Sequence, residues 1–286
     1  MYTLHWQPPY DWAWMLRFLG ARAVAGVEEV SETRYVRSYA FRGHRGVISA
    51  EPDETSATLK VTLSEGLEPI AEHCLQRLTR LFDLSCEPER INMQLGELAA
   101  ARPGLRLPGS VDPFEQAVRA VLGQLVSVAM AAKLTAKVAH RYGEVMDEAP
   151  GFIAFPTAQQ IAAADAEVLK GLGMPLKRAQ ALITLAEAAC DGTFPLQKPD
   201  DVEQGVKALL TYPGIGRWTA NYFALRGWQA KDIFLPDDYA IKQRFAGMTP
   251  AQTRRYAERW QPFRSYALLH IWFTPEWSPE PQNDAR

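Results

Sequence analysis

Two adjacent acids, Asp237 and Asp238, stand in the last quarter of the chain, and a carboxylate of this kind can act on developing positive charge. They stand just before Ile241 and Phe245, whose spacing is typical of a short helix. An acid at a helix start caps the free backbone amides of the first turn. A capping acid is also held rigidly, so the same carboxylate can stabilise a cationic transition state beside it. The pattern therefore fits a structural cap, a catalytic group, or both.

A second candidate site is the turn Tyr212-Pro-Gly-Ile-Gly216 between two predicted helices, Val202 to Thr211 and Arg217 to Trp228. Glycine lacks a Cβ, so it can adopt positive φ and let backbone amides approach a ligand closely. The second helix begins here with its positive dipole end exposed, which suits a phosphate group. A plain turn between packed helices would use the same residues.

Length and composition set broad limits. A chain of 286 residues has room for two or three compact units, and 47% hydrophobic with 22% charged residues is typical of a folded protein. The net charge of -2 gives no overall attraction to nucleic acid, so any DNA contact must be local. Neither a signal peptide nor a long apolar segment is evident, and we expect a cytoplasmic protein without membrane contact.

The three cysteines, Cys74, Cys86 and Cys190, are too few and too widely spaced for a disulfide framework. The sequence also lacks CxxC and HExxH patterns, which are common in zinc sites. We therefore expect buried thiols and no metal centre built from side chains.

The N-terminal part is predicted to be an α+β domain over residues 1–100, with an antiparallel sheet and helices on one side. One helix runs through Trp12, Met15, Phe18 and Leu19, and a second spans about Glu68 to Asp83. The predicted strands are Tyr2 to Trp6, Thr33 to Phe41, Arg45 to Glu51 and Ala57 to Leu63.

The rest of the chain, residues 101–286, is predicted to be all helical after a linker at 101–109 that is rich in Pro and Gly. It divides into 112–230, with the helical hairpin at 202–228, and C-terminal helices at 231–274 that carry Asp238. Asp112 and Pro113 open the first helix as cap and first residue. An apolar stripe continues through Leu125, but Gly123 and a new cap at Ser127 predict a loop there.

Three segments together identify the chain as similar to a known family. Pro113 to Ser127, Leu210 to Asn221 and Phe234 to Arg244 resemble, in this order, the first core helix, the hairpin and the catalytic segment of helix-hairpin-helix DNA glycosylases. More narrowly, the chain resembles the bacterial 3-methyladenine DNA glycosylase II family, and the likeness extends into the N-terminal domain.

This resemblance implies a DNA glycosylase of base excision repair. It would flip and hydrolytically excise alkylated bases such as 3-methyladenine and 7-methylguanine from duplex DNA, leaving an abasic site. Asp238 matches the catalytic aspartate. Trp218 stands where relatives that also cut the strand carry a lysine, so a monofunctional enzyme is implied. The chain lacks the four-cysteine pattern of iron-sulfur relatives, and no cofactor is expected for the chemistry.

The resemblance also assigns the remaining site residues. Leu125 would be the wedge that fills the gap left by the flipped base, although it could instead belong to the core. Backbone amides of Gly214, Gly216 and Thr219 would contact phosphate, and carbonyls of Leu210, Tyr212 and Gly214 could hold a sodium or potassium ion. The base pocket would be lined by Phe18, Trp218, Tyr222, Tyr239 and Trp272. The expected partner is double-stranded DNA with damaged bases, bound by a monomer.

Two alternatives stay open at this point. Helix-hairpin-helix units also serve as non-catalytic DNA-binding modules, which have no need of Asp238 or of the tryptophans near it. A nucleosidase acting on small molecules would require several acids and a hydroxyl-binding loop, and the sequence shows no such set.

Overall fold

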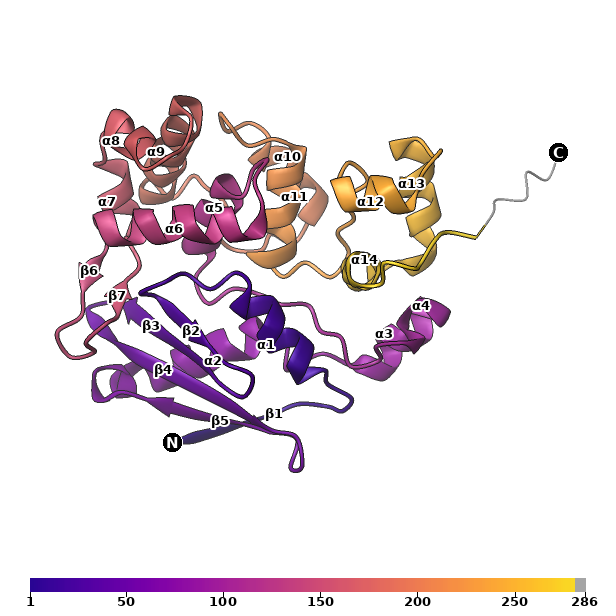
Figure 1. The fold of residues 1–286 in the computed structure, drawn as a ribbon, viewed down its shortest axis with the longest axis horizontal. Helices are drawn as coiled ribbons and strands as arrows, with labels where there is room; N and C mark the ends of the chain where they lie inside the picture. Colours follow the sequence, from indigo (N-terminus) through magenta and orange to yellow (C-terminus); the bar gives the residue numbers. More distant parts are fainter. Residues whose placement is uncertain (281–286) are drawn as a thin grey trace.

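The computed structural model describes residues 1–280, and its N-terminal part is built on a five-stranded antiparallel sheet (Figure 1). The spatial order of the strands is β1-β5-β4-β3-β2, so the first strand pairs with the last. The strands are β1 (Tyr2–His5), β2 (Glu28–Val30), β3 (Tyr35–Phe41), β4 (His44–Asp53) and β5 (Thr58–Leu63). The predicted sheet is thus confirmed, with β2 added at one edge.

Helix α1 (Trp12–Gly20) begins at Asp11, whose side chain accepts a hydrogen bond from the amide of Trp14. The helix predicted from Glu68 is in fact a 3-10 helix, η1 (Glu65–Ile70), followed by α2 (Ala71–Leu81). Pro69 explains this difference, because proline lacks an amide hydrogen and disfavours the α conformation of the residue before it.

Two short helices, α3 (Pro88–Leu95) and α4 (Glu97–Ala100), lead into an extended segment that the sequence marks as a linker. Arg106 anchors this segment: it is fully buried and donates hydrogen bonds to the carbonyl oxygens of Gln7 and Pro9. The segment is therefore bound to the N-terminal unit. The exact boundary after residue 100 stays a prediction, and residues 281–286 of the predicted C-terminal unit lie outside the described part.

The C-terminal part consists mainly of helices. In Figure 1 the group from α5 to α11 lies above the sheet, and α12 to α14 form a second group beside it. The helices are α5 (Pro113–Leu122), α6 (Val128–Tyr142), α7 (Ala158–Ala162), α8 (Ala166–Gly171), α9 (Leu176–Cys190), α10 (Val202–Leu209), α11 (Arg217–Arg226), α12 (Tyr239–Arg244), α13 (Pro250–Ala257), the 3-10 helix η2 (Glu258–Trp260) and α14 (Arg264–Phe273).

The expectation of helices alone after the linker missed a small hairpin, β6 (Glu144–Val145) and β7 (Ile153–Ala154). Each strand has only two residues, which is too short for a periodic pattern. Contacts with the N-terminal unit hold it: the amide of Ile153 donates to the carbonyl of Gly26, and Ser38 Oγ donates to the carbonyl of Ile153. The hairpin is thus specified by tertiary contacts.

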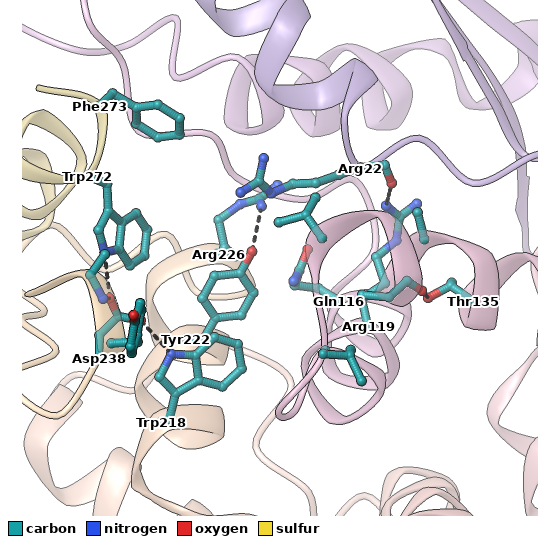
Figure 2. A pocket seen from close by; sticks show the side chains of 17 residues that line it. Arg22, Gln116, Arg119, Thr135, Trp218, Tyr222, Arg226, Asp238, Trp272 and Phe273 are labelled. Carbon is teal, nitrogen blue, oxygen red and sulfur yellow. Dashed lines mark hydrogen bonds between the residues drawn. The ribbon is translucent and has the colours of Figure 1, made fainter. Parts of the chain in front are cut away.

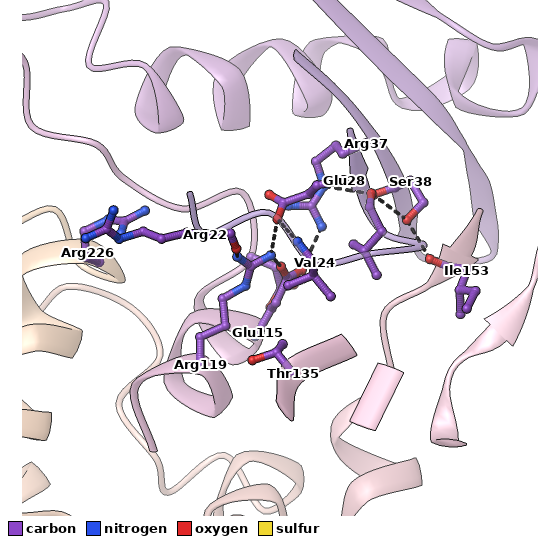
Figure 3. Close-up of polar contacts among 12 residues, drawn as sticks. Arg22, Val24, Glu28, Arg37, Ser38, Glu115, Arg119, Thr135, Ile153 and Arg226 are labelled. Atoms are coloured by element: carbon purple, nitrogen blue, oxygen red, sulfur yellow. Dashed lines mark hydrogen bonds and ion pairs between the residues drawn. The ribbon is translucent and has the colours of Figure 1, made fainter. Parts of the chain in front are cut away.

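Charged side chains are buried where the sheet meets α5 (Figure 3). Arg37 Nη2 lies 2.7 Å from Glu115 Oε2, and Arg119 Nη2 lies 2.6 Å from Glu28 Oε2 and 2.5 Å from Glu115 Oε1. Burial by itself would raise the pKa of Glu28, but the guanidinium groups of Arg119 and Arg37 lower it to about 2. The two acids and two arginines form a charge-balanced network between the two parts of the chain.

The cysteine prediction is confirmed in part. Cys74 and Cys86 are buried free thiols, as expected, whereas Cys190 at the end of α9 is exposed. Its position in the last turn of a surface helix, just before the Asp191-Gly192 turn, places it at the solvent.

Candidate active site

The hairpin between α10 and α11 has the predicted backbone geometry. Gly214 adopts φ of +79°, and a Cβ at this position would lie 2.4 Å from the Cβ of Ala181. Both the conformation and the close approach of α9 therefore require glycine. Gly216 is the N-cap of α11 and has open space around it.

The amides that the sequence assigns to phosphate gather at this helix start. Within residues 1–280, the amides of Gly214, Gly216 and Thr219 donate to no other group of the protein. The Thr219 side chain is buried and accepts a hydrogen bond from Gln124 Nε2 at 2.9 Å. The turn thus presents free donors at the positive end of a ten-residue helix, which is an arrangement that binds anions.

Asp238 is the N-cap of α12, and four hydrogen bonds fix its carboxylate. Oδ1 accepts from the amides of Ala240 at 3.0 Å and Ile241 at 3.3 Å, and from Trp272 Nε1 at 3.0 Å. Oδ2 accepts from Trp218 Nε1 at 3.1 Å. Oδ2 therefore keeps the larger free capacity. The neighbouring Asp237 is exposed and lies outside the residues that line the cleft.

Asp238 opens onto a cleft of about 350 Å³ with aromatic walls (Figure 2). The rings of Trp218 and Tyr222 stack with centroids 4.8 Å apart and planes 8° from parallel. Trp272 stands on the Asp238 side, and Tyr239 is 78% exposed at the cleft. Of the aromatic residues predicted for the pocket, the structure brings these four together around Asp238.

Phe18 lies one layer behind this cleft. It is buried in α1, is absent from the cleft lining, and packs edge to face against Phe273 at 5.9 Å between centroids. The side chains of Arg22 and Phe273 line the cleft in front of it. Phe18 therefore supports residues of the cleft rather than facing its space.

The other tryptophans of the C-terminal region divide into two groups. Trp228 and Trp260 are buried in the core, and Trp277 packs against Trp260 with centroids 5.9 Å apart. Only Trp218 and Trp272 reach the cleft. Residue type alone could not separate the two groups, because most aromatic side chains of either kind are largely buried.

Leu125 projects from the loop between α5 and α6 and is fully exposed, with φ of +55°. The predicted break is confirmed: α5 ends at Leu122, and Ser127 caps α6 by accepting a hydrogen bond from the amide of Met130. A leucine held in the left-handed region and fully in solvent contributes nothing to the core. Its setting fits an apolar group that contacts a partner.

Gln124 is a site residue that the sequence analysis missed. Its Nε2 donates to the carbonyl of Gly214 at 2.8 Å as well as to Thr219, and its own carbonyl accepts from Arg178 Nη2 at 2.6 Å. The loop of Leu125 is therefore tied to the hairpin. The local sequence does not predict these contacts, because the loop and the hairpin are far apart along the chain.

Three arginines in the cleft lining, Arg22, Arg119 and Arg226, were also missed. Arg226 stands eight residues after Trp218 on the same helix, which is a helical repeat that could have indicated a shared face. Arg22 follows Phe18 by four residues, a spacing that places side chains together at a helix end. Their guanidinium groups give the cleft a polar side opposite the carboxylate.

The Arg226 guanidinium changes the character of Tyr222. Arg226 Nη1 lies 3.3 Å from the Tyr222 hydroxyl and donates to it. Burial by itself would raise the pKa of Tyr222, but the positive charges of Arg226 and Arg22 lower it to about 8. The phenol therefore ionises closer to neutral pH than an ordinary tyrosine.

Two absences apply to the described part of the chain. Residues 1–280 contain no group of three or more His, Cys, Asp and Glu side chains that could hold a metal ion. Within the same residues, no helix combines the length and apolar character that crossing a membrane requires.

The arrangement can bind a flat ring between aromatic faces while a fixed carboxylate stands at one side of it. A cationic ring is attracted to such faces, most strongly to those of tryptophan. A carboxylate held in place can stabilise positive charge on an atom next to that ring without reorganising during the reaction. The free amides at the start of α11 and the exposed Leu125 are close in sequence to residues that line the same cleft.

Comparison with known proteins places this geometry in a family. Residues 118–262 match the HhH-GPD superfamily base excision DNA repair proteins, and residues 1–112 match the AlkA N-terminal domain. The chain is 68% identical over 280 residues to DNA-3-methyladenine glycosylase 2 of Escherichia coli K12, covering 98% of this chain and 99% of that protein.

Two further relatives extend the comparison. The chain is 31% identical to a probable bifunctional transcriptional activator/DNA repair enzyme AlkA of Mycobacterium tuberculosis H37Rv, across 95% of this chain and 57% of that protein. The fold resembles that of a 3-methyladenine DNA-glycosylase from Archaeoglobus fulgidus, with a TM-score of 0.82, 22% identity, and coverage of 96% and 98% of the two chains. The chain belongs to the HhH-GPD superfamily of base excision DNA repair proteins, which confirms the family predicted from its sequence.

Proposed function

We propose that this protein is a monofunctional DNA glycosylase that flips alkylated bases out of duplex DNA and removes them hydrolytically, leaving abasic sites. The observation that carries this proposal is the Asp238 carboxylate, held by two indole N–H groups and two helix amides at the aromatic cleft. The relative with 68% identity supports 3-methyladenine and related bases as substrates.

Asp238 acts on the sugar. Breaking an N-glycosidic bond builds positive charge at the anomeric carbon, and a fixed carboxylate next to it lowers the energy of that state. An N-alkylated purine already carries positive charge and leaves readily, so a general acid is dispensable. Oδ2, which accepts one hydrogen bond where Oδ1 accepts three, is the oxygen available to the substrate.

Trp218, Tyr222, Tyr239 and Trp272 hold the flipped base. The stacked Trp218 and Tyr222 rings form one wall, and Trp272 lies beside Asp238. Electron-rich faces on both sides favour electron-deficient bases such as 3-methyladenine and 7-methylguanine. Phe18 takes part through Phe273 and Arg22, against which it packs.

The DNA backbone binds at the hairpin, and Leu125 enters the duplex. The free amides of Gly214, Gly216 and Thr219 contact one phosphate. The carbonyls of Tyr212 and Gly214 each accept one hydrogen bond from the protein and keep a second lone pair. Together with the carbonyl of Leu210 they could hold a sodium or potassium ion between the turn and the phosphate.

A non-catalytic DNA-binding module is the alternative. It accounts for the hairpin but leaves the Asp238 carboxylate and the cleft without a purpose. We infer that the protein acts as a monomer, which leaves its surface free to contact both strands of the duplex. We also infer that it is located in the cytoplasm.

The test is release of methylated purines from duplex DNA by wild type, Asp238→Asn and Asp237→Asn, with strand breaks measured before and after alkali. Wild type and Asp237→Asn should release bases, and breaks should appear only after alkali. Asp238→Asn should lose at least about a hundredfold in rate while still binding DNA that contains an abasic site. Full activity of Asp238→Asn would refute the carboxylate assignment. A wild type that binds duplex but releases no base would favour the binding module.

A further inference from the structure

Leu125 depends on its neighbours to keep its position. It is fully exposed and adopts φ of +55°, a left-handed conformation that is unfavourable for a leucine. A residue keeps such a conformation only when surrounding contacts hold it there. Its own side chain supplies no packing, because it lies in solvent. The contacts that fix Leu125 must therefore come from the residues on either side of it.

On the C-terminal side, the loop is held by the start of α6. Ser127 caps this helix by accepting a hydrogen bond from the amide of Met130 at 3.2 Å. The bond joins two residues of one short segment. It therefore fixes where the loop ends, but it does not determine how the loop lies relative to the hairpin between α10 and α11.

On the N-terminal side, Gln124 joins the loop to the hairpin and to α9, which lie beside it in Figure 1. Its Nε2 donates to the carbonyl of Gly214 at 2.8 Å and to Thr219 Oγ1 at 2.9 Å, so both donors of the carboxamide are in use. Its backbone carbonyl accepts from Arg178 Nη2 of α9 at 2.6 Å. Hydrogen bonds from two other elements thus hold the residue next to Leu125.

These contacts of Gln124 lie at the turn that we assign to phosphate. Within residues 1–280, the backbone amides of Gly214, Gly216 and Thr219 donate to no protein group. Gln124 is hydrogen-bonded to two of these three residues, and Leu125 follows it directly in the chain. A short chain of hydrogen bonds therefore joins the proposed phosphate site to the proposed wedge.

We propose that Gln124 is a positioning residue that holds Leu125 in a fixed place relative to the phosphate-binding turn, so that binding of the DNA backbone also directs the leucine into the duplex. This inference rests on the proposed function. Gln124 is absent from the residues that line the cleft, so it takes no part in holding the base or in the chemistry at Asp238. Its contribution to excision passes through Leu125.

The test is a double-mutant cycle with Gln124→Met, Leu125→Ala and the variant that carries both changes. Methionine keeps the length of the glutamine side chain and removes its two donors. Excision of 7-methylguanine is measured with enzyme in excess, opposite cytosine and opposite adenine, because a mismatched base costs less to flip. Gln159→Met is the matched control, since Gln159 is an exposed glutamine of α7 that does not line the cleft.

Each single change should slow excision opposite cytosine by about tenfold, the loss expected when Leu125 no longer fills the gap in the duplex. The double variant should also lose about tenfold, because the two residues act as one unit. Opposite adenine, Gln124→Met should keep most of the wild-type rate, which also shows that the variant is folded and that its cleft is intact. Gln159→Met should match wild type on both duplexes.

A loss of about a hundredfold in the double variant, the product of two independent losses, would overturn the inference. An equal loss by Gln124→Met on both duplexes would mean that Gln124 is only structural. A wild-type rate opposite cytosine for Gln124→Met or for Leu125→Ala would also refute the inference. All of these outcomes leave the proposed function intact as long as wild type releases 7-methylguanine, whereas a wild type that releases no base refutes the proposed function itself.

Discussion

Asp238 caps α12, and in the proposed function the same carboxylate is also the catalytic group. The carboxylate caps α12 through Oδ1, and the same bonds leave Oδ2 directed toward the cleft with a single donor from Trp218. Because a helix and two indole rings hold the group, it does not need to reorganise as charge develops. The hydrogen bonds that cap α12 thus also fix the position of the carboxylate.

Tyr222 offers a test of the cleft electrostatics at the level of one residue. In a pH titration followed by tyrosinate absorbance, wild type should show one tyrosine ionising near pH 8, below the ordinary value of 10. Positive charge at Arg226 and Arg22 favours the anionic phenolate, so the pKa of Tyr222 falls in spite of burial.

The step near pH 8 should vanish in Tyr222→Phe and move upward in Arg22→Met. Burial holds the pKa of Tyr10, Tyr35 and Tyr266 well above the ordinary value, so these three tyrosines do not contribute to the step. If the step persists in Tyr222→Phe, the low pKa belongs to another residue.

At the scale of elements, α11 supplies three side chains of the cleft and leads into it from the glycine turn. Trp218, Tyr222 and Arg226 recur every four residues and so share the face of the helix that lines the cleft. Thr219 lies on the adjacent face and meets Gln124. One ten-residue helix therefore joins the free amides of the glycine turn to the aromatic cleft.

The loop from Gly123 to Ser127 supplies a prediction at this scale. Leu125→Ala should slow excision from fully paired duplex DNA by about tenfold, because roughly 1.5 kcal/mol of apolar contact with the unstacked bases is lost. The deficit should shrink when the target base is mismatched, since less energy is then needed to flip it. Base release from the two duplexes measures the effect.

Met93→Ala is the matched control for this loop. Met93 is 84% exposed on α3 and does not line the cleft, so its removal should leave both rates unchanged. Equal rates for Leu125→Ala and wild type on paired DNA would show that Leu125 does not enter the duplex.

At the scale of the whole molecule, the buried network explains what the N-terminal sheet contributes. Glu28 and Arg37 come from β2 and β3, while Glu115 and Arg119 come from α5 (Figure 3). Arg119 in turn holds the backbone of Arg22 at the cleft. The sheet thus contacts the cleft indirectly, through the ion pairs of Arg119 and through α1.

Glu115→Gln should lower the free energy of unfolding by about 3 to 5 kcal/mol, because it leaves buried arginine charge without its partner. Urea unfolding measures the change. Glu51→Gln is the control: Glu51 pairs with Arg34 at 3.4 Å on the surface, where such a pair contributes less than about 1 kcal/mol. Similar losses in the two variants would mean that the buried network adds little stability.

The sequence by itself determined the elements with strong local signals. The glycine turn, the caps at Asp112, Ser127 and Asp238, and the period of the helices are set by backbone conformation and nearby side chains. The same local motifs identified the family, and they named Asp238 and the aromatic residues that surround it.

Only the tertiary structure decided which distant residues meet. Gln124 and the hairpin β6–β7 carry no local signal, because their partners Gly214 and Gly26 are remote in the chain. Whether an aromatic residue faces the cleft or the core, as Trp272 and Trp228 do, depends on packing that residue type does not encode. Short segments determine helix capping and turn conformation, whereas burial and ion pairing arise only when segments that are distant in the chain pack together.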